Sequence, residues 1–395
     1  MKVIRLRAGK ERSVLRRHPW VFQGSVEKGK ADAGETVRVE SHDGRFLAWA
    51  AFSPESQIRV RAWSFDEAER IDAAFFAGRI AQALKLRERL GIAAQSDGVR
   101  LIHGEADGLP GLIVDRYGDV LSAQFLSAGT ERWKQEIADA LVAATGCSRV
   151  YERSDSGVRG LEGLAPVAGW LRGEGGTEVT IREHGWRLTL DVAEGHKTGY
   201  YLDQRDNRKL FADLVKQFGC QRVLNCYSYT GGFSVAALAG GATDVTSVDS
   251  SAPALARATA HVTLNGCNPS HHTALDADVN GTLRQLLKDG QRFDAIVLDP
   301  PKFAPSAAHA DRASRAYKDI NRLAFKLLEP GGVLFTYSCS GGISGDLFHK
   351  IVASAGCDAQ VDAYILERTG AAVDHPMTVA FPEGEYLKGL VVMRK

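Results

Sequence analysis

The sequence predicts an α/β protein with a small N-terminal β-barrel domain, a mixed α/β middle domain and a C-terminal doubly wound, Rossmann-like parallel sheet. Its 395 residues are too many for one ordinary core, which favours two or three domains. Short segments near the N-terminus alternate apolar and polar residues, whereas strand-like and helix-like segments alternate after Trp186. The predicted domains are residues 1–71, 72–185 and 186–395.

The composition is that of a soluble globular protein, with 44% hydrophobic and 25% charged residues. Because the net charge is only +1, any nucleic-acid binding must come from local patches. The six cysteines contain no CxxC pair, which argues against a zinc site and against a disulfide framework. No stretch approaches the ~20 apolar residues that span a bilayer, and the start lacks the apolar run of a signal peptide. We therefore expect a cytoplasmic protein with reduced thiols, no metal and no membrane partner.

The first domain carries the pattern of half-buried strands. Residues 36–40 and 57–63 alternate apolar and polar side chains. A turn at residues 42–45 precedes a further apolar strand at 46–50. These segments predict a small domain built from short strands.

A basic run opens the chain and leads directly into aromatic residues. Arg16 and Arg17 end the run, and His18, Trp20 and Phe22 follow at once. Cations beside aromatic rings are the combination that contacts phosphates and stacks on bases, which makes this segment a candidate RNA-binding site. Two alternatives stay open. The charges can protect a solvated edge strand, and the aromatic residues, at strand spacing, can belong to the core.

The middle domain mixes helices and strands. A helical pattern covers residues 71–90, and a second covers 131–145. A turn at 107–111 leads into a hairpin at 112–121, and a short strand follows at 149–153. No residues with a chemical role are predicted in this domain.

The C-terminal domain repeats a strand–helix unit, which predicts a parallel sheet with helices on its faces. Ser251 can cap a helix that opens at Pro253 and ends at Asn265 and Gly266. The predicted strands are 222–226, 245–249, 293–298, 333–338, 361–366 and 389–393, and the other predicted helices are 232–239 and 317–328.

A candidate cofactor loop follows the first strand of this domain. Gly231 and Gly232 let a ligand approach the backbone closely, but the pattern is not GxGxxG, so a pyrophosphate is not the obvious ligand. Asp249 ends the next strand, where an acid can bind both ribose hydroxyls of a nucleoside cofactor. S-adenosylmethionine (SAM) has a ribose and no phosphates, so it fits better than NAD. Asp278 could bind the adenine amine. A Gly-Gly turn on its own is equally typical of an ordinary α/β connection.

Two further strands end at residues that suggest chemistry. Pro300 and Pro301 cannot donate to a sheet ladder, so the strand ends and Asp299 stands at its tip. Cys339 lies just past the end of an apolar strand, between two serines. Because the carboxyl ends of parallel strands share one edge, a carboxylate and a thiol meet there beside the cofactor loop. The alternatives are an Asp that caps a loop and a Cys that fills the core.

This pair favours covalent catalysis on a ring. A free thiol is only ~3% thiolate at neutral pH, so Cys339 requires activation. Addition of the thiolate to carbon 6 of a cytosine would make carbon 5 nucleophilic toward the sulfonium methyl group, and Asp299 would hold a proton on N3. Cys226 is the rival thiol, but its place at the cofactor loop suits contact with the methyl donor.

Taken together, these motifs resemble the RlmI group of 23S rRNA cytosine-C5 methyltransferases, and the likeness covers essentially the whole chain. The separate motifs match that group in order along the sequence. They are residues 17–22, 195–205, 225–233, Asp249, Asp278, 299–303, 338–340, 374–376 and 382–388.

The resemblance implies an N-terminal PUA domain that binds RNA and a class I methyltransferase sheet. It implies Cys339 as the nucleophile and Asp299 as its partner. The cofactor-binding residues that it implies are Gln204, Arg205, Asn225, Tyr229, Thr230, Gly231, Phe233, Asp249, Ser250, Asp278 and Asp299. The RNA-binding candidates are Arg16, Arg17, His18, Trp20, Lys302 and Phe303.

The expected partner is 23S rRNA or an assembly intermediate of the large subunit, and a homodimer stays open. One departure from related enzymes concerns product release. Many RNA cytosine-C5 methyltransferases carry a second cysteine beside the Asp-Pro-Pro motif, whereas this chain has Pro301 and Lys302 there. The base that removes the carbon-5 proton is therefore unassigned.

Two other functions compete with this one. Asp299-Pro300-Pro301 with Phe303 is also similar to the way amino-methyltransferases grip a flipped base, so an rRNA methyltransferase could act on a ring or exocyclic nitrogen without a cysteine. A non-catalytic RNA-binding or ribosome-assembly factor is the third hypothesis, and failure to bind SAM would favour it.

Overall fold

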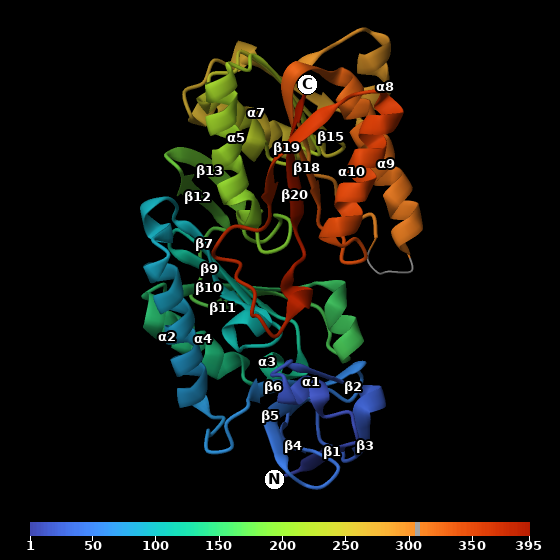
Figure 1. Cartoon of the computed structure of the whole chain (residues 1–395). Coiled ribbons are helices and arrows are strands. Elements are labelled where there is room, and N and C mark those ends of the chain that lie inside the picture. Colours follow the sequence, from blue (N-terminus) through green and yellow to red (C-terminus); the bar gives the residue numbers. More distant parts are fainter. Residues whose placement is uncertain (305–308) are drawn as a thin grey trace. The chain divides into compact units, whose positions relative to one another are not determined.

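The computed structural model describes residues 1–304 and 309–395, and the chain divides into two compact units (Figure 1). Unit 1 comprises Met1–Gly185, Leu190–Leu202 and Val373–Gly384. Unit 2 comprises Trp186–Thr189, Asp203–Ala372 and Glu385–Lys395. Unit 1 thus contains the first two predicted domains and two later segments, and the three predicted domain ranges stay a prediction.

Unit 1 begins with a six-stranded sheet in the order β2-β6-β5-β4-β1-β3. Its core is a cluster of buried aliphatic residues, among them Ile4, Val37, Val39 and Val60. The alternation noted in the sequence is the physical reason, because every second side chain of a strand faces this core. The elements are β1 (Val3–Leu6), α1 (Arg12–Leu15), β2 (Trp20–Phe22), β3 (Val26–Lys28), β4 (Thr36–Glu40), β5 (Phe46–Phe52) and β6 (Ile58–Ser64).

Part of the basic N-terminal run forms ion pairs inside this sheet domain. Lys2 lies 2.8 Å from Glu35 and 3.2 Å from Asp32, and Arg5 lies 3.0 Å from Glu40. These cations therefore help to hold neighbouring strands together. Because β1 lies between β4 and β3 in the sheet, the edge-strand alternative is wrong for this part of the run.

The middle part of unit 1 is a five-stranded sheet in the order β11-β10-β9-β8-β7, covered by helices. Helix α2 begins where the Asp72 carboxylate accepts the backbone N–H groups of Ala74 and Phe75. The elements are α2 (Ala73–Arg89), β7 (Gly98–His103), β8 (Leu112–Tyr117), β9 (Val120–Phe125), α3 (Ala128–Arg132), α4 (Lys134–Thr145), β10 (Arg149–Ser154) and β11 (Val167–Arg172).

The helix predicted at 131–145 differs in the structure. It is two helices, α3 and α4, that meet at Trp133. Ser127 and Thr130 form a capping box that starts α3 early, and the Trp133 backbone leaves the helical region at φ −98° and ψ 15°. The Trp133 ring packs 5.0 Å from that of Phe76, so tertiary packing sets the break. A hairpin that was not predicted, β12 (Glu178–Glu183) and β13 (Trp186–Asp191), follows this domain.

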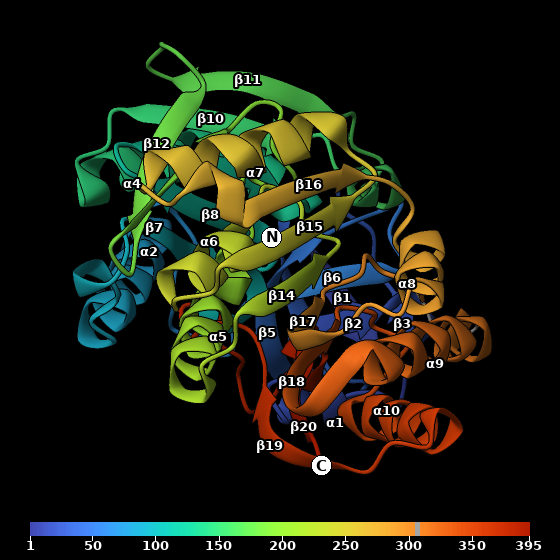
Figure 2. The ribbon, with the colours of Figure 1, turned by 90° about the horizontal axis from the view of Figure 1, so that it is seen from above.

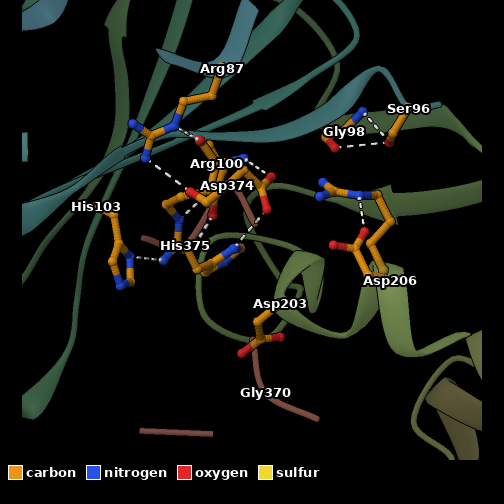
Figure 3. Close-up of polar contacts among 12 residues, drawn as sticks. Arg87, Ser96, Gly98, Arg100, His103, Asp203, Asp206, Gly370, Asp374 and His375 are labelled. Carbon is orange, nitrogen blue, oxygen red and sulfur yellow. Dashed lines mark hydrogen bonds and ion pairs between the residues drawn. The ribbon is translucent and has the colours of Figure 1, made fainter. Parts of the chain in front are cut away.

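A buried polar network holds the returning segment 373–384 within unit 1 (Figure 3). The Asp374 carboxylate accepts the backbone N–H of Arg100 at 2.9 Å, and its carbonyl accepts the Arg87 guanidinium at 2.9 Å. Arg87 also forms a two-pronged ion pair with Asp107 at 2.6 and 2.9 Å. His375 lies 3.0 Å from the Asp374 carboxylate. The segment is thus fixed by charge-assisted bonds.

Replacing Arg87 by methionine is expected to lower the free energy of unfolding by roughly 3–5 kcal/mol, because the Asp107 carboxylate would stay buried without its partner. Both side chains are only 4% exposed. Urea denaturation followed by circular dichroism measures the change. In the control variant Arg45→Met, which removes an exposed pair with Asp43, we expect little effect. Equal stability of the two variants would contradict the prediction.

Unit 2 contains a seven-stranded sheet in the order β16-β15-β14-β17-β18-β20-β19, and Figure 2 shows these strands side by side. Its first five strands run parallel, whereas β20 is antiparallel to both β18 and β19. The strands are β14 (Arg222–Cys226), β15 (Asp244–Asp249), β16 (His272–Asp276), β17 (Phe293–Leu298), β18 (Leu328–Ser338), β19 (Ala363–Thr369) and β20 (Lys388–Arg394). The predicted doubly wound sheet is confirmed.

Helices cover both faces of this sheet (Figure 2). One face packs α5 and α6 against alternate strand residues such as Val223 and Val297. The other packs α8, α9 and α10 against the intervening residues, such as Leu224 and Leu298. The helices are α5 (Arg205–Phe218), α6 (Gly232–Ala239), α7 (Ala252–Leu264), α8 (Val279–Lys288), α9 (Ala310–Leu327) and α10 (Gly345–Ala359).

The strand order reverses between β14 and β17, since the chain first adds β15 and β16 on one side and later β17 and β18 on the other. In open α/β sheets, ligands bind at the carboxyl ends of the strands at such a switch point. The loops after β14, β15 and β17 are therefore the place to look for a site. Among the described residues, no helix is both long and apolar enough to span a membrane.

Candidate active site

The loop between β14 and α6 has an unusual backbone. Tyr227 and Tyr229 adopt positive φ angles of 57° and 47°, a left-handed conformation that side chains other than glycine rarely take. Gly231 has φ 74°, and a Cβ there would lie 2.6 Å from the Cβ of Ala258. Only glycine fits this position. Strained loop geometry of this kind is typical of ligand-binding sites.

Asp249 closes the loop from the neighbouring strand. Its Oδ2 accepts the backbone N–H of Tyr229 at 2.8 Å, and its Oδ1 accepts that of Ser251 at 3.0 Å. Each carboxylate oxygen can accept a second hydrogen bond, so ribose hydroxyls can still bind. The buried hydroxyls of Ser228 and Thr230 have no partner among the described residues. An acidic acceptor with nearby unused hydroxyls fits the ribose of a nucleoside cofactor such as SAM.

The other predicted cofactor residues of this loop region are held by the scaffold. Asn225 is buried, and its amide donates to the Ser234 hydroxyl at 2.9 Å. Phe233 lies in the core between the sheet and α5. Asp278 caps α8 by accepting the backbone N–H of Gly281 at 2.7 Å, whereas Ser250 is exposed. Their contact with cofactor stays a prediction, and the scaffold roles of Asn225 and Phe233 are sufficient to explain their burial.

Gln204 and Arg205 lie at the start of α5 and are both buried. The Gln204 side-chain oxygen Oε1 accepts a hydrogen bond from the Asn207 side-chain amide at 2.6 Å, and the Arg205 guanidinium pairs with Asp206 at 3.0 Å. Helix α5 was not among the predicted helices, although its apolar residues recur with helical spacing. Their predicted contact with SAM also stays a prediction.

The two catalytic candidates meet at the carboxyl edge of the sheet. The Cys339 thiol donates to the Pro300 carbonyl, with Sγ and oxygen 3.8 Å apart. Asp299 precedes that proline directly, at the end of β17, and both candidates are partly buried. Within the described residues, no group of three or more His, Cys, Asp or Glu side chains could hold a metal ion. Segments about forty residues apart thus place a thiol beside the Asp-Pro-Pro segment that follows β17.

Three residues that the sequence analysis did not name as site residues hold the backbone next to this thiol. The Ser340 hydroxyl accepts the Ala304 N–H and bonds the Tyr317 hydroxyl, both at 3.0 Å. The Ser340 carbonyl accepts the Lys388 ammonium at 2.9 Å. Burial is the main reason that the pKa of Tyr317 is raised. Tyr317 lies in α9 and Lys388 in β20. The only sequence signal for Lys388 was its position as the last residue of the motif at 382–388.

Aromatic rings line the same region. The Phe303 ring lies 4.8 Å from that of Tyr317 and 6.5 Å from that of Tyr227. Phe303 and Tyr227 are partly exposed, while Lys302 is exposed. Partly exposed rings at the ligand-binding edge of a sheet can stack on a flat base.

The expectation for Cys226 is wrong. Its side chain is fully buried in the hydrophobic cluster between the sheet and α8–α10 rather than facing the cofactor loop. Burial raises the pKa of this thiol, which makes it unreactive. The physical reason is strand alternation, since Cys226 faces the same side of β14 as Leu224.

The candidate RNA-binding residues of unit 1 do not form one open basic surface. The Trp20 indole donates to Glu105 at 2.8 Å and packs 4.7 Å from Phe381, so much of this ring serves internal packing. His18 lies 3.3 Å from Glu383, whereas Arg16 and Arg17 are exposed. Arg17 lines a cavity of about 870 Å³ whose charged residues are Arg17, Arg79, Lys85, Arg89, Asp66, Glu69, Glu105 and Asp107. Their role in RNA binding stays a prediction.

Family models match this architecture. Residues 4–65 match a PUA-like domain, and residues 163–374 match the S-adenosylmethionine-dependent methyltransferase family. The sheet, the strained loop and these matches define a SAM-dependent methyltransferase with an N-terminal PUA-like domain. SAM is therefore its cofactor.

Relatives that match along almost the whole chain narrow this class. The chain is 50% identical over 393 residues to ribosomal RNA large subunit methyltransferase I of Shewanella denitrificans, and 98% of each chain is covered. It is 48% identical over 387 residues to the protein of the same name from Salmonella enteritidis, with 97% of this chain and 95% of the relative covered. The chain belongs to the ribosomal RNA large subunit methyltransferase I family.

Two solved structures share the fold over 100% of both chains. A protein from Streptococcus mutans, described as a SAM-dependent methyltransferase, is 21% identical with a TM-score of 0.85. SMU.776, described as a methyltransferase and solved in complex with SAH, is 22% identical with a TM-score of 0.87. At this identity the similarity establishes the fold alone, and it confirms the predicted fold class.

Replacing Asp249 by alanine is expected to weaken SAM binding by about 10- to 100-fold, the loss that follows from removing a charged hydrogen-bond acceptor. Isothermal titration calorimetry with SAM measures the dissociation constant. The control is Asp244→Ala at the opposite end of β15, where the carboxylate pairs with Arg222 at 3.1 Å. Unchanged affinity in the Asp249 variant would show that the ribose is held elsewhere.

Proposed function

We propose that this protein methylates carbon 5 of a cytosine in large-subunit ribosomal RNA, through a covalent adduct between Cys339 and carbon 6. The observation that carries the proposal is the position of the Cys339 thiol, 3.8 Å from the carbonyl of Pro300, the residue that follows Asp299 in the chain. Both groups stand at the edge of the sheet where the cofactor loop also ends. A thiol placed there suits nucleophilic attack on a base.

The substrate class comes from the relatives. Proteins 48–50% identical to this chain carry the name ribosomal RNA large subunit methyltransferase. The PUA-like match at residues 4–65 is consistent with an RNA substrate. We therefore propose 23S rRNA, free or within an assembly intermediate, as the substrate.

The residues at the edge would act in sequence. The Cys339 thiolate adds to carbon 6 of the cytosine, and Asp299 holds a proton at N3 so that the ring can accept the added electron pair. SAM would supply the methyl group as an electrophile to carbon 5 and would leave as S-adenosylhomocysteine. Loss of the carbon-5 proton then lets the thiolate leave carbon 6, which restores the aromatic ring and the free enzyme. The partly exposed rings of Tyr227 and Phe303 would hold the flipped base, with the buried Tyr317 ring packed behind Phe303.

The test is to incubate the protein with labelled SAM and unmodified large-subunit rRNA and to identify the product nucleoside by mass spectrometry. We expect 5-methylcytidine. Running free rRNA and isolated large-subunit particles in parallel distinguishes the two forms of the substrate.

A second function is favoured by one observation. The partly exposed Phe303, which follows the Asp299-Pro300-Pro301 motif in the chain, also suits an rRNA methyltransferase that acts on a ring or exocyclic nitrogen. In that case the product would be a methylated guanosine or adenosine, or an N-methylated cytidine, and Cys339 would be dispensable. The same mass spectrum decides between the two functions.

A further inference from the structure

We infer that Lys388 is a positioning residue for the Cys339 thiol: its ammonium group fixes the backbone beside the thiol and supplies a positive charge that favours the thiolate. This inference deepens the proposed function and rests on it, since it concerns how the nucleophile is activated. The proposed catalytic pair does not explain that activation. A thiolate is favoured by a nearby positive charge, and the Asp299 carboxyl group carries none.

The geometry follows from the pairing of two strands. Lys388 is the first residue of β20, and Ser338, the last residue of β18, is its partner in the antiparallel register. Side chains at paired positions lie on the same face of a sheet, so Lys388 shares the face of Ser338 and stands beside the backbone that continues from β18 into Cys339 and Ser340. Its Nζ donates to the Ser340 carbonyl at 2.9 Å and to the Tyr386 carbonyl at 2.9 Å.

Burial makes this charge effective. Lys388 is only 6% exposed, which is rare for a lysine. An ammonium has three N–H donors, and two of them are used by the carbonyls, while the third has no partner among the described residues. An anion next to this group would gain more than in water, because solvent screens it less.

The charged groups around Lys388 indicate that the anion stabilised by its ammonium is the thiolate of Cys339. Burial is the main reason that the pKa of Lys388 is lowered, and the charge of Cys339 acts in the opposite direction. Electrostatic coupling is mutual, so a positive charge on Lys388 favours a negative charge on the Cys339 sulfur. The other charged groups that act on Lys388 are Glu385, which precedes β20, and Lys302, which follows β17. Both of these side chains are exposed to solvent, which screens their charges.

The Ser340 carbonyl links this charge to the position of the thiol. Ser340 follows Cys339 directly, and its hydroxyl is already held by Tyr317 and by the Ala304 N–H. The hydrogen bond from Lys388 to the Ser340 carbonyl is the third fixed contact of Ser340 and the one that holds its backbone. Loss of Lys388 would therefore free the peptide next to the nucleophile as well as remove a charge.

The test is the rate of alkylation of Cys339 by iodoacetamide as a function of pH, in the full chain. Peptide mass spectrometry separates Cys339 from the other five cysteines. The variant is Lys388→Met, which keeps the stem and removes the charge. We expect the midpoint of its profile to move upward by about 1–3 pH units, the range that an adjacent opposite charge produces. Lys388→Arg, which keeps the charge, should recover most of the shift.

Controls keep the outcomes distinct. Lys350→Met removes an exposed lysine that pairs with Asp346, and it should leave the profile unchanged. Unaltered SAM affinity shows that each variant is folded. If Lys388→Met does not fold, Lys388→Gln is used in its place. An unchanged midpoint in the Met or Gln variant overturns the inference, and so does an equal shift in the Arg variant, which would indicate a steric role.

The proposed function can fail separately. Alkylation needs neither RNA nor methyl transfer. If the unmodified protein makes no 5-methylcytidine but the midpoint of the alkylation profile still moves in Lys388→Met, the proposed reaction is wrong and the proposed activation of the thiol stands. If 5-methylcytidine forms and the midpoint stays, the reaction stands and Lys388 has no part in activating the thiol.

Discussion

Replacing Cys339 by alanine is expected to reduce methylation of rRNA by about 10⁴-fold or more, the size of loss seen when a covalent catalyst loses a member of its nucleophilic unit. The reason is that carbon 5 of cytosine becomes nucleophilic only after a thiolate adds to carbon 6. The methylation rate under single-turnover conditions, with labelled SAM, measures the loss directly.

SAM affinity should stay within a few-fold in this variant, because Cys339 lies beside the Pro300 carbonyl rather than in the loop closed by Asp249. The control is Cys357→Ala, since Cys357 is an exposed free cysteine in α10. Normal activity of the Cys339 variant would rule out the covalent mechanism and leave methylation at a nitrogen.

Replacing Asp299 by asparagine is expected to reduce the rate of the chemical step by roughly 10²- to 10⁴-fold, the usual contribution of a positioned acid or base. Asparagine has nearly the same shape but cannot hold a proton for N3 of the ring. The single-turnover rate should fall while the Michaelis constant for rRNA changes much less.

Asp289→Asn is the matched control, because this carboxylate is exposed at the end of α8 and bonds only the Gln285 amide among the described residues. A variant of Asp299 that keeps its rate but loses SAM affinity would show that this carboxylate serves the cofactor and not the base. Such a result would move the search for the N3 partner to another residue.

Much of unit 2 could be predicted because its strands are buried on both faces. The bounds of β14, α6 and β17 agree with the predicted segments, since continuous apolar runs and Gly punctuation mark them locally. The break at Trp133 could not be predicted in this way. It depends on the contact of that ring with Phe76, which lies in another helix.

The same division applies to the candidate site. Asp249 ends a strand, and Asp299 and Cys339 each follow one directly, so a local pattern was sufficient to select them. Cys226 was misjudged because strand alternation alone does not say which face carries the ligand. Trp20 was assigned to RNA on composition, whereas the structure gives its indole N–H to Glu105.

The amino-acid sequence by itself determined the strand–helix alternation, the glycine-bearing loop and the residues that end the strands, because these depend on backbone sterics and local burial. Only the tertiary structure decided which of these ends meet. It placed the Cys339 thiol against the Pro300 carbonyl and brought Lys388, nearly fifty residues further along the chain, onto the Ser340 carbonyl. Such contacts depend on the register between strands that are distant in sequence, and no local pattern carries that information.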